Sequence, residues 1–519
     1  MSSLQDKKRR KKKVLCLLNN SDSESYIWVQ RYIIHEVLCL PMGQYPLAPL
    51  SGVDNGAGGY CPGSDKIMVA SRSISRYTAS ITRFVFGGFV PNLAKPVNRI
   101  IFLVCVLVTG ALAGAFVWLF FFLMDKGISF LWSTVPAWLG ALTADIFPIL
   151  SQGSFGFIPY PLLVCVLGGI IIGLYTKKVK VQPEELNKVM ATVKETGRYD
   201  YSQIGRLSFA ALLPLLFGGS VGPEAGLTGV IAGLCTWVGD RMRRFGADIR
   251  ALTIAGTQAA LTAVFTAPFY GFVAPLSGTA DGAEGDMDIK LPKPQKAIVY
   301  FCAIVGALGS FLVLGEVFGS GCGLPRFSSV EVGTFELIWL IPLTLAGTVC
   351  GWVYYAANRG SKCVSKNLGQ RPVVKAVLAG ALLAVCGMVL PYTMFAGEAQ
   401  IHYLMEDYVV IPAVVLIMTG LIKCAITPTC INLGWCGGHF FPLIFSGISL
   451  GYGFAVLTGA EPVFCVAACT AALMGAVMRQ PVMAALLLVM CFPLKGIAVM
   501  LVAALIGSAI PLPKALREE

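Results

Sequence analysis

Two short glycine-rich stretches decide the fold of this chain: GGSVGPEAG at residues 218–226 and GGHFFP at residues 437–442. Each stretch interrupts an apolar run and leads into another one. Proline fits the first position of a helix because its missing N–H is not needed there, and glycine lets the backbone turn and approach a ligand. Both stretches therefore predict a helix that begins inside an apolar environment.

A second pair of breaks follows in the same order. Residues 259–268 read AALTAVFTAP, and residues 471–481 read AALMGAVMRQP. In both, a helix of small residues ends shortly before a proline that starts a further apolar helix. We therefore interpret the chain as two repeats, 96–280 and 281–513, of the inverted kind found in transporters with discontinuous helices.

The composition places these repeats in a membrane. Of the 519 residues, 56% are hydrophobic and only 13% are charged, whereas about 25% of the residues of a soluble domain are charged. A helix needs about 20 apolar residues to cross the hydrocarbon core. Stretches of sufficient length are 100–124, 251–280, 337–358, 376–397 and 425–460. We expect an all-α polytopic membrane protein built from broken, tilted helices.

The two ends are predicted to lie outside the pore. Residues 1–95 combine a basic run, KKRRKKK at 7–13, with turn-rich polar sequence, which predicts a poorly ordered extension. Residues 514–519 form a short tail with no soluble regulatory domain expected after it. Basic clusters around Lys177 and Arg241 indicate cytoplasmic loops by the positive-inside rule. We expect both termini in the cytoplasm and the protein in the plasma or inner membrane.

Several classes of protein are excluded by the residues that are missing. The seventeen cysteines form no CxxC pair, and the three histidines form no HExxH motif, so no metal site, cofactor or metalloprotease is expected. No nucleophile–base constellation indicates an enzyme. The basic tail lacks the aromatic or folded context of a nucleic-acid-binding module.

A helix that starts within a membrane predicts an anion site. Its first backbone N–H groups lack partners and carry about half a positive charge. A dehydrated anion can supply those partners in a region without water. Two such helices from opposite repeats can point at one place, whereas a cation pathway would need carboxylates there.

The motifs resemble those of the CLC chloride channel and transporter family. Gly219-Ser220-Val221-Gly222-Pro223 is similar to the family's G-[RK]-E-G-P, and Gly438-His439-Phe440-Phe441-Pro442 matches G-x-F-x-P. The resemblance covers roughly 96–513 and is that of a divergent, prokaryote-like member without CBS domains. It implies a homodimer in a lipid bilayer, with a separate pore in each subunit.

The resemblance also implies which residues bind the anion. The backbone N–H groups of His439 and Phe440 are expected to contact it, and His439 is expected to act through its backbone rather than its ring. The backbone near Val221 and Gly222 is expected to frame the outer part of the site. Gly219, Ser220 and Gly438 complete the predicted set.

Departures from the family pattern favour conduction without proton coupling. The family's gating glutamate falls at Val221, which cannot ionise. Its internal proton-transfer glutamate would fall near Ser277 or Gly278, where no carboxylate occurs. The first anion motif, G-S-G-I-P, is not recognisable, and its serine falls near Lys180. The tyrosine of the last helix has no match in 491–500.

Two charged residues remain open to two interpretations. Glu224 follows Pro223, where a carboxylate either stabilises the helix dipole or replaces the missing gate and proton acceptor. Lys180 is either an ordinary cytoplasmic loop residue or an anion-attracting charge at the inner mouth. We predict passive conduction of chloride or another inorganic anion. The alternatives are a proton-coupled chloride or fluoride antiporter that uses Glu224 and, from another class, an organic-anion or bicarbonate permease.

Overall fold

The structure of the protein, a computed structural model, describes six stretches of the chain. These are residues 96–138, 160–242, 249–277, 293–319, 325–489 and 491–516. All of them belong to one compact unit, Thr78–Glu519. The predictions for residues 1–95 and for Gly278 lie outside the described residues.

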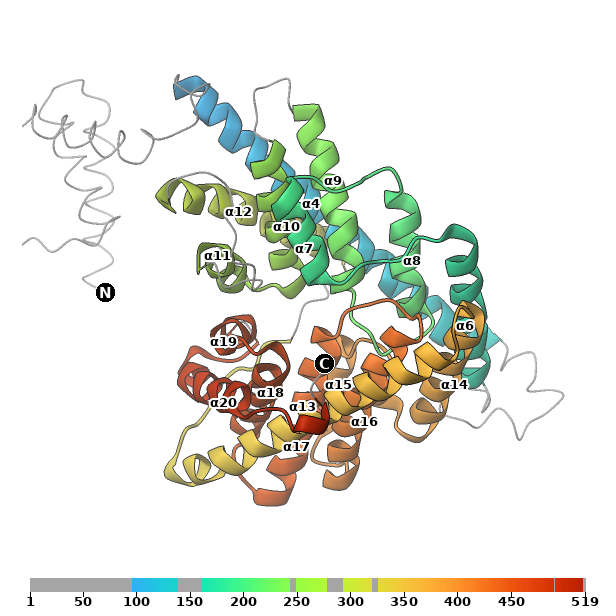
Figure 1. Ribbon diagram of the computed structural model, residues 1–519. Coiled ribbons are helices and arrows are strands. Elements are labelled where there is room, and N and C mark those ends of the chain that lie inside the picture. The colour runs from blue at the N-terminus through green and yellow to red at the C-terminus, as the bar shows by residue number, and fades with distance from the viewer. Residues whose placement is uncertain are drawn as a thin grey trace, which may run out of the picture. The chain divides into compact units, whose positions relative to one another are not determined.

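The described residues form helices and contain no named strand (Figure 1). The helices of the first part are α4 (Pro96–Ser129), η2 (Phe130–Thr134), α6 (Tyr160–Val179), α7 (Leu186–Thr196), α8 (Ile204–Leu216), α9 (Glu224–Met242), α10 (Ile249–Phe265), α11 (Pro268–Ser277) and α12 (Lys293–Phe318). Those of the second part are α13 (Thr334–Asn367), α14 (Pro372–Val389), η4 (Pro391–Thr393), α15 (Glu398–Asp407), α16 (Ala413–Asn432), α17 (Phe440–Thr458), α18 (Pro462–Met478), α19 (Pro481–Leu488), η5 (Leu494–Gly496), α20 (Ile497–Ala509) and η6 (Lys514–Leu516).

Seven helical stretches among the described residues are long and apolar enough to cross a membrane. They are Ile100–Trp138, Tyr160–Val179, Gln295–Phe318, Thr334–Asn367, Pro372–Val389, Ala413–Asn432 and Phe440–Thr458. Large apolar side chains on their surfaces are exposed in the isolated chain, such as Ile338 at 72% and Val389 at 75%. A surface of this kind suits lipid and not water. The predicted class, an all-α polytopic membrane protein, is confirmed.

Long apolar runs are broken, as the glycine and proline positions predicted. The run 251–280 is divided between α10 and α11 by a turn at Thr266, which has a positive φ of 49°. The run 425–460 is divided between α16 and α17 by residues 433–439. One detail differs from the prediction: α17 begins at Phe440, so Pro442 is its third residue and not its first. Proline is tolerated there because N–H groups of the first turn have no partner within the helix.

The order of helices and breaks occurs twice. The series α8, break, α9, α10, break, α11 is repeated as α16, break, α17, α18, break, α19. The second break of each series contains a non-glycine residue with positive φ, Thr266 (49°) and Arg479 (57°), two residues before a proline. This correspondence supports two structural repeats. The division at residue 280 stays a prediction.

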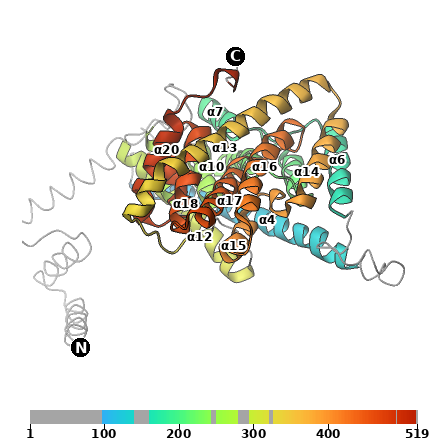
Figure 2. The ribbon, with the colours of Figure 1, turned by 90° about the horizontal axis from the view of Figure 1, so that it is seen from below.

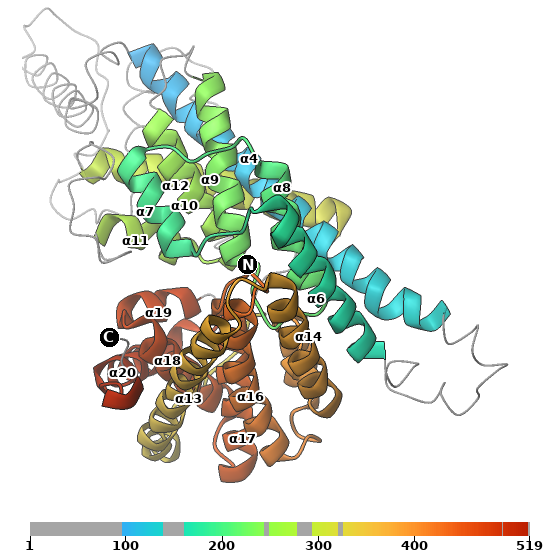
Figure 3. The same cartoon turned by 45° about the vertical axis from the view of Figure 1, so that its right-hand side comes forward.

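The helices pack closely through small residues. In α4, a Cβ atom at Gly110 or Gly114 would overlap the backbone of Ala303 or Ala307 in α12. Figure 2 shows α17 and α18 side by side, and they are in contact. Figure 3 shows α7 to α11 in one group, α16 to α20 in another, and α6 beside α14. The first breaks of the two series, before α9 and α17, meet where these groups adjoin.

Candidate functional site

The candidate site is built where two chain breaks pair with each other. The N–H of Gly222 donates to the carbonyl of Gly438 at 2.7 Å, and the N–H of Gly438 donates to the carbonyl of Gly222 at 2.7 Å. The two segments run antiparallel at this bridge. The pairing satisfies both amides in a buried region, where an unpaired amide would be unfavourable. It also means that neither amide is available to an anion in this structure, although the sequence placed both residues in the anion site.

The side chain of Glu224 lies beside this pair. Glu224 is the first residue of α9 and is fully buried. Its Oε1 accepts a hydrogen bond of 2.7 Å from the backbone N–H of Phe440, the first residue of α17. Its Oε2 is buried and has no hydrogen-bond partner within the described part of the chain. A carboxylate therefore occupies the helix N-terminus at which the sequence predicted an anion.

The space around this carboxylate depends on two glycines. A Cβ atom built on Gly222 would overlap the carboxylate of Glu224, and so would one built on Gly438. Gly222 and Gly438 both lie in the described part of the chain, and neither has a positive φ. The close approach of the carboxylate, and not backbone strain, therefore explains glycine at both positions. The Glu224 carboxylate therefore fills the space between Gly222 and Gly438, termed the seat.

Three other predicted residues hold the first break in place. Val221 is fully buried and packs against Gly437: a Cβ atom built on Gly437 would lie 2.6 Å from the Cβ of Val221. The hydroxyl of Ser220 lies 3.1 Å from that of Thr427 in α16. The N–H of Gly219 donates to the carbonyl of Pro214 at 2.8 Å. The break is therefore fixed from both helix groups.

His439 stands directly before α17. It is the N-cap residue of that helix, and its side chain makes no capping hydrogen bond. Its ring is half-buried between the rings of Tyr354, at a centroid distance of 5.7 Å, and Phe440, at 4.6 Å. The arrangement agrees with a role for the His439 backbone, which stays a prediction.

A cavity of about 330 Å³ reaches this site. His439 and Phe440 line one part of it. Its other polar side chains are those of Glu185, Gln258, Tyr270, Tyr354, Tyr355, Asn358, Lys362, Asn432 and Gln480. None of these residues was predicted from the sequence, although Gln258 and Asn358 are polar residues within apolar runs and could have been noticed on that ground.

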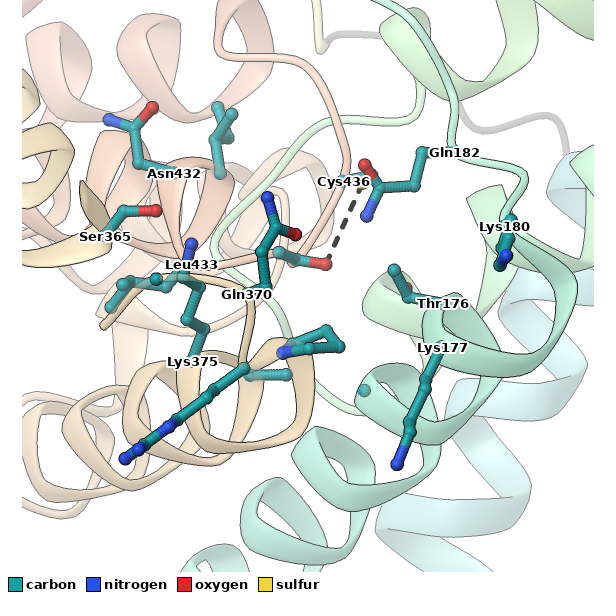
Figure 4. A pocket seen from close by; sticks show the side chains of 17 residues that line it. Thr176, Lys177, Lys180, Gln182, Ser365, Gln370, Lys375, Asn432, Leu433 and Cys436 are labelled. Carbon is teal, nitrogen blue, oxygen red and sulfur yellow. Dashed lines mark hydrogen bonds between the residues drawn. The ribbon is translucent and has the colours of Figure 1, made fainter. Parts of the chain in front are cut away.

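Lys180, for which an inner-mouth charge was one of two interpretations, lines a different cavity. That cavity has a volume of about 650 Å³, and its cations are Lys177, Lys180, Arg371 and Lys375. Figure 4 shows Lys177 and Lys180 on one side and Lys375 with Asn432 on the other. Among the described residues, no acidic side chain lines it. It shares Ile431 and Asn432 with the cavity that reaches Phe440, so the two adjoin.

The described residues contain no cluster of three or more histidine, cysteine, aspartate or glutamate side chains that could hold a metal ion. The side chain of Ser277, near which the family's internal glutamate would fall, lies outside the part of the chain whose side chains are described.

Comparison with known proteins agrees with these features. A sequence model of the voltage gated chloride channel family matches residues 168–511. The chloride channel protein CLC-e of Arabidopsis thaliana is 22% identical over 318 residues, which cover 57% of this chain and 42% of that protein. The chain thus spans about two fifths of the length of that relative.

Solved structures of low sequence identity share the fold. A CLC-type fluoride/proton antiporter superposes with a TM-score of 0.56 at 18% identity, covering 80% of this chain and 96% of that one. A slow cyanobacterial Cl⁻/H⁺ antiporter gives 0.61 at 16% identity, covering 79% and 94%. A eukaryotic CLC transporter gives 0.57 at 16% identity, covering 81% and 73%.

Proposed function

The chain belongs to the voltage-gated chloride channel (CLC) family, and from this premise we propose that it conducts chloride or a similarly small inorganic anion passively, with Glu224 as its gate. The observation that carries the proposal is the 2.7 Å hydrogen bond from the Phe440 N–H to the Glu224 carboxylate. An anion that binds at the N-terminus of α17 needs the same donor.

The carboxylate and the anion exclude each other. Both carry negative charge, both accept hydrogen bonds from the first amides of α17, and like charges repel strongly where water is scarce. An anion can therefore bind only after the carboxylate swings away or takes up a proton. Either event opens the path, and the second one makes opening depend on pH.

The surroundings of the carboxylate support a small ion. Glu224 is fully buried, and the segments on either side of it are joined by the paired amides and carbonyls of Gly222 and Gly438. An anion that replaces the carboxylate has the space that a carboxyl group leaves, which favours chloride, fluoride, bromide or nitrate over a larger organic anion.

The second candidate function is proton-coupled anion exchange. It is favoured by the buried carboxylate of Glu224 and by the fold shared with structures named as fluoride/proton and Cl⁻/H⁺ antiporters. Coupling also needs a proton acceptor between the site and the inner solution. Val221 cannot ionise, and neither of the positions Ser277 and Gly278 carries a carboxylate. Passive conduction is accordingly the first proposal.

Flux through liposomes, recorded with chloride and pH electrodes together, separates the two functions. Passive conduction predicts that an imposed chloride gradient drives no uphill proton movement. Proton pumping in fixed proportion to chloride that Glu224→Gln abolishes would establish the second candidate. Pumping that persists in Glu224→Gln would contradict both, because the proton would then travel by another route.

We further propose a homodimer with one pore per subunit and with both termini in the cytoplasm. The CLC resemblance and the apolar exposed surfaces of the spans support this arrangement. Mass measurement of the purified protein in detergent tests the dimer. Single-channel or dilution-series flux measurement tests for two independent pores.

A further inference from the structure

A second buried ionisable residue lies near the site and has no place in the mechanism so far. Lys423 is in α16, and its side chain is fully buried. Its Nζ lies within hydrogen-bond distance of four backbone carbonyls, those of Tyr392 (3.1 Å), Thr393 (3.3 Å), Met394 (2.8 Å) and Phe395 (2.9 Å). An ammonium group without water requires such partners, and an ionisable residue at membrane depth usually has a function.

The carbonyls around Lys423 belong to a segment that is tied to the first break. The N–H of Phe395 donates to the carbonyl of Gly218 at 2.9 Å. Gly218 has a φ of 83°, and a Cβ atom there would lie 2.9 Å from Cε of Met394. Residues 392–395 therefore hold the start of the break in a left-handed conformation that suits glycine.

The helix of Lys423 also contacts the break directly. Thr427 lies one helical turn after Lys423, and its hydroxyl donates to the carbonyl of Lys423 at 2.9 Å. The same hydroxyl lies 3.1 Å from that of Ser220. Residues 218–220 are thus held by the carbonyl segment on one side and by α16 on the other.

Lys423 further contacts the helix that supplies the anion donor. Its Nζ lies 4.6 Å from the centroid of the Phe445 ring, which is suitable for a cation–π interaction. Phe445 belongs to α17, the helix whose first residue is Phe440. The Lys423 side chain therefore links α16 to two further elements, the segment before α15 and α17.

We propose that Lys423 is a positioning residue for the anion site. By gathering the carbonyls of residues 392–395 it fixes the segment 218–222 against 437–440, so that the Phe440 N–H faces the seat that Glu224 now fills. This inference rests on the proposed function, because it assumes that the anion binds at the Phe440 N–H. It assigns to Lys423 an effect on anion affinity that a merely structural lysine would not have.

The test measures chloride binding by calorimetry in the Glu224→Gln protein, where the competing charge is absent. Adding Lys423→Met removes all donors, and we expect chloride affinity to fall about tenfold or more, as it does when outer partners of other bound ions are removed. Adding Lys423→Gln keeps two N–H donors and should restore affinity to within about threefold of the parent. Cys424→Ala, at the neighbouring buried position whose Sγ contacts the carbonyl of Cys350, is the matched control and should leave affinity unchanged.

Hydrogen exchange of the peptides that cover 218–222 and 391–397 supplies a second measurement. Exchange should be fast in Lys423→Met and close to normal in Lys423→Gln. If Lys423→Met does not fold, Thr427→Val takes its place, because it removes the hydroxyl through which α16 contacts Ser220; faster exchange of 218–222 and a parallel loss of affinity are then expected. Unchanged affinity in the folded Lys423→Met or Thr427→Val protein overturns the proposal. So does equal loss in both Lys423 variants with normal exchange, because charge and not position would then be responsible.

Failure of the proposed function gives a different result. In that case Glu224→Gln alone would not bind chloride more tightly than the unaltered protein. The Lys423 variants would then change exchange without changing chloride affinity, and the role in anion binding would be rejected together with the site.

Discussion

Glu224 and Phe440 are 216 positions apart in the chain, and the carboxylate of the first accepts a 2.7 Å hydrogen bond from the backbone N–H of the second. This contact joins the first residues of α9 and α17. A carboxylate at a helix N-terminus is ordinarily a stabilising group at the end of its own helix. Here it reaches the N-terminus of another helix instead, so it competes with any anion that would bind there.

Glu224→Gln should strengthen anion binding. The amide has nearly the same shape but carries no charge, and a hydrogen bond to a charged acceptor is about twice as strong as one to a neutral acceptor. We expect chloride affinity, measured by calorimetry, to rise about tenfold, or ~1.4 kcal/mol.

A matched control for this substitution is Glu461→Gln. Glu461 caps α18, where its carboxylate accepts hydrogen bonds from the N–H groups of Val463 and Phe464. Its substitution should lower the free energy of unfolding by about 1 kcal/mol, since a lost helix cap typically costs about 0.5–2 kcal/mol. Chloride affinity should stay unchanged. A rise in affinity in both variants, or in neither, would show that Glu224 does not compete with the anion.

Chloride flux through the unaltered protein should increase as pH falls. Protonation of Glu224 removes the charge that competes for the Phe440 N–H, whereas at high pH the carboxylate keeps that place. The sign is therefore more flux in acid and less in alkali. Flux measured in liposomes over a pH series should show this slope, and Glu224→Gln should flatten it. A slope that survives the substitution would assign the pH dependence to another group.

The motif spacing predicted where the helices break but not which side chain fills the site. Alignment with the family placed the gate at Val221, because a motif fixes positions along the chain and not side-chain directions. In the structure Val221 packs beside Gly437, whereas Glu224 reaches across to α17. That contact joins two halves of the sequence, so no local pattern could have revealed it. The only available signal was a carboxylate in an apolar context, which left two interpretations open.

Lys423 was missed for a different reason. It is a single basic residue in the run 413–432, which is otherwise apolar enough to cross a membrane. Its partners are backbone carbonyls, and these have no sequence signature. An intramembrane cation is itself a signal of function, so its presence could have been noticed, but its contacts with residues 392–395 could not.

Gly438→Val should abolish anion binding and conduction. The new side chain would overlap the Glu224 carboxylate and occupy the seat of the anion. Gly309→Val is the control, since no atom lies within 4 Å of a Cβ built there. Flux in liposomes, with thermal unfolding as the check on folding, should show loss in the first variant only. Normal conduction by a folded Gly438→Val protein would show that the anion does not bind at this helix terminus.

His439→Gln should have a small effect by comparison. The expected anion contact is through the backbone of His439, and its ring lies between two other rings. Chloride affinity should stay within about tenfold, or ~1.4 kcal/mol, of the unaltered protein. A larger loss in a stably folded variant would mean that the imidazole itself serves the anion.

The lysines that line the two cavities are expected to differ in their effect on chloride flux. Lys362 lines the cavity that reaches Phe440, whereas Lys180 lines the larger neighbouring one. If anions reach the site through the cavity that Lys362 lines, Lys362→Gln should lower chloride flux more than Lys180→Gln at low ionic strength. The reason is that a positive charge in the lining raises the local anion concentration. The difference should fade near 1 M salt, where the screening length is about 3 Å. A larger effect at Lys180 would identify the basic cavity as the inner mouth.

Anomalous diffraction from bromide-soaked crystals tests the central claim most directly, since bromide is a small inorganic anion that can be located without ambiguity. The account predicts a bromide peak within hydrogen-bond distance of the Phe440 backbone nitrogen in Glu224→Gln. It predicts no such peak at alkaline pH in the unaltered protein, where the carboxylate keeps the site. A bromide ion at Phe440 beside an undisplaced Glu224 carboxylate would contradict the account, and so would bromide sites in the Glu224→Gln protein that avoid Phe440 altogether.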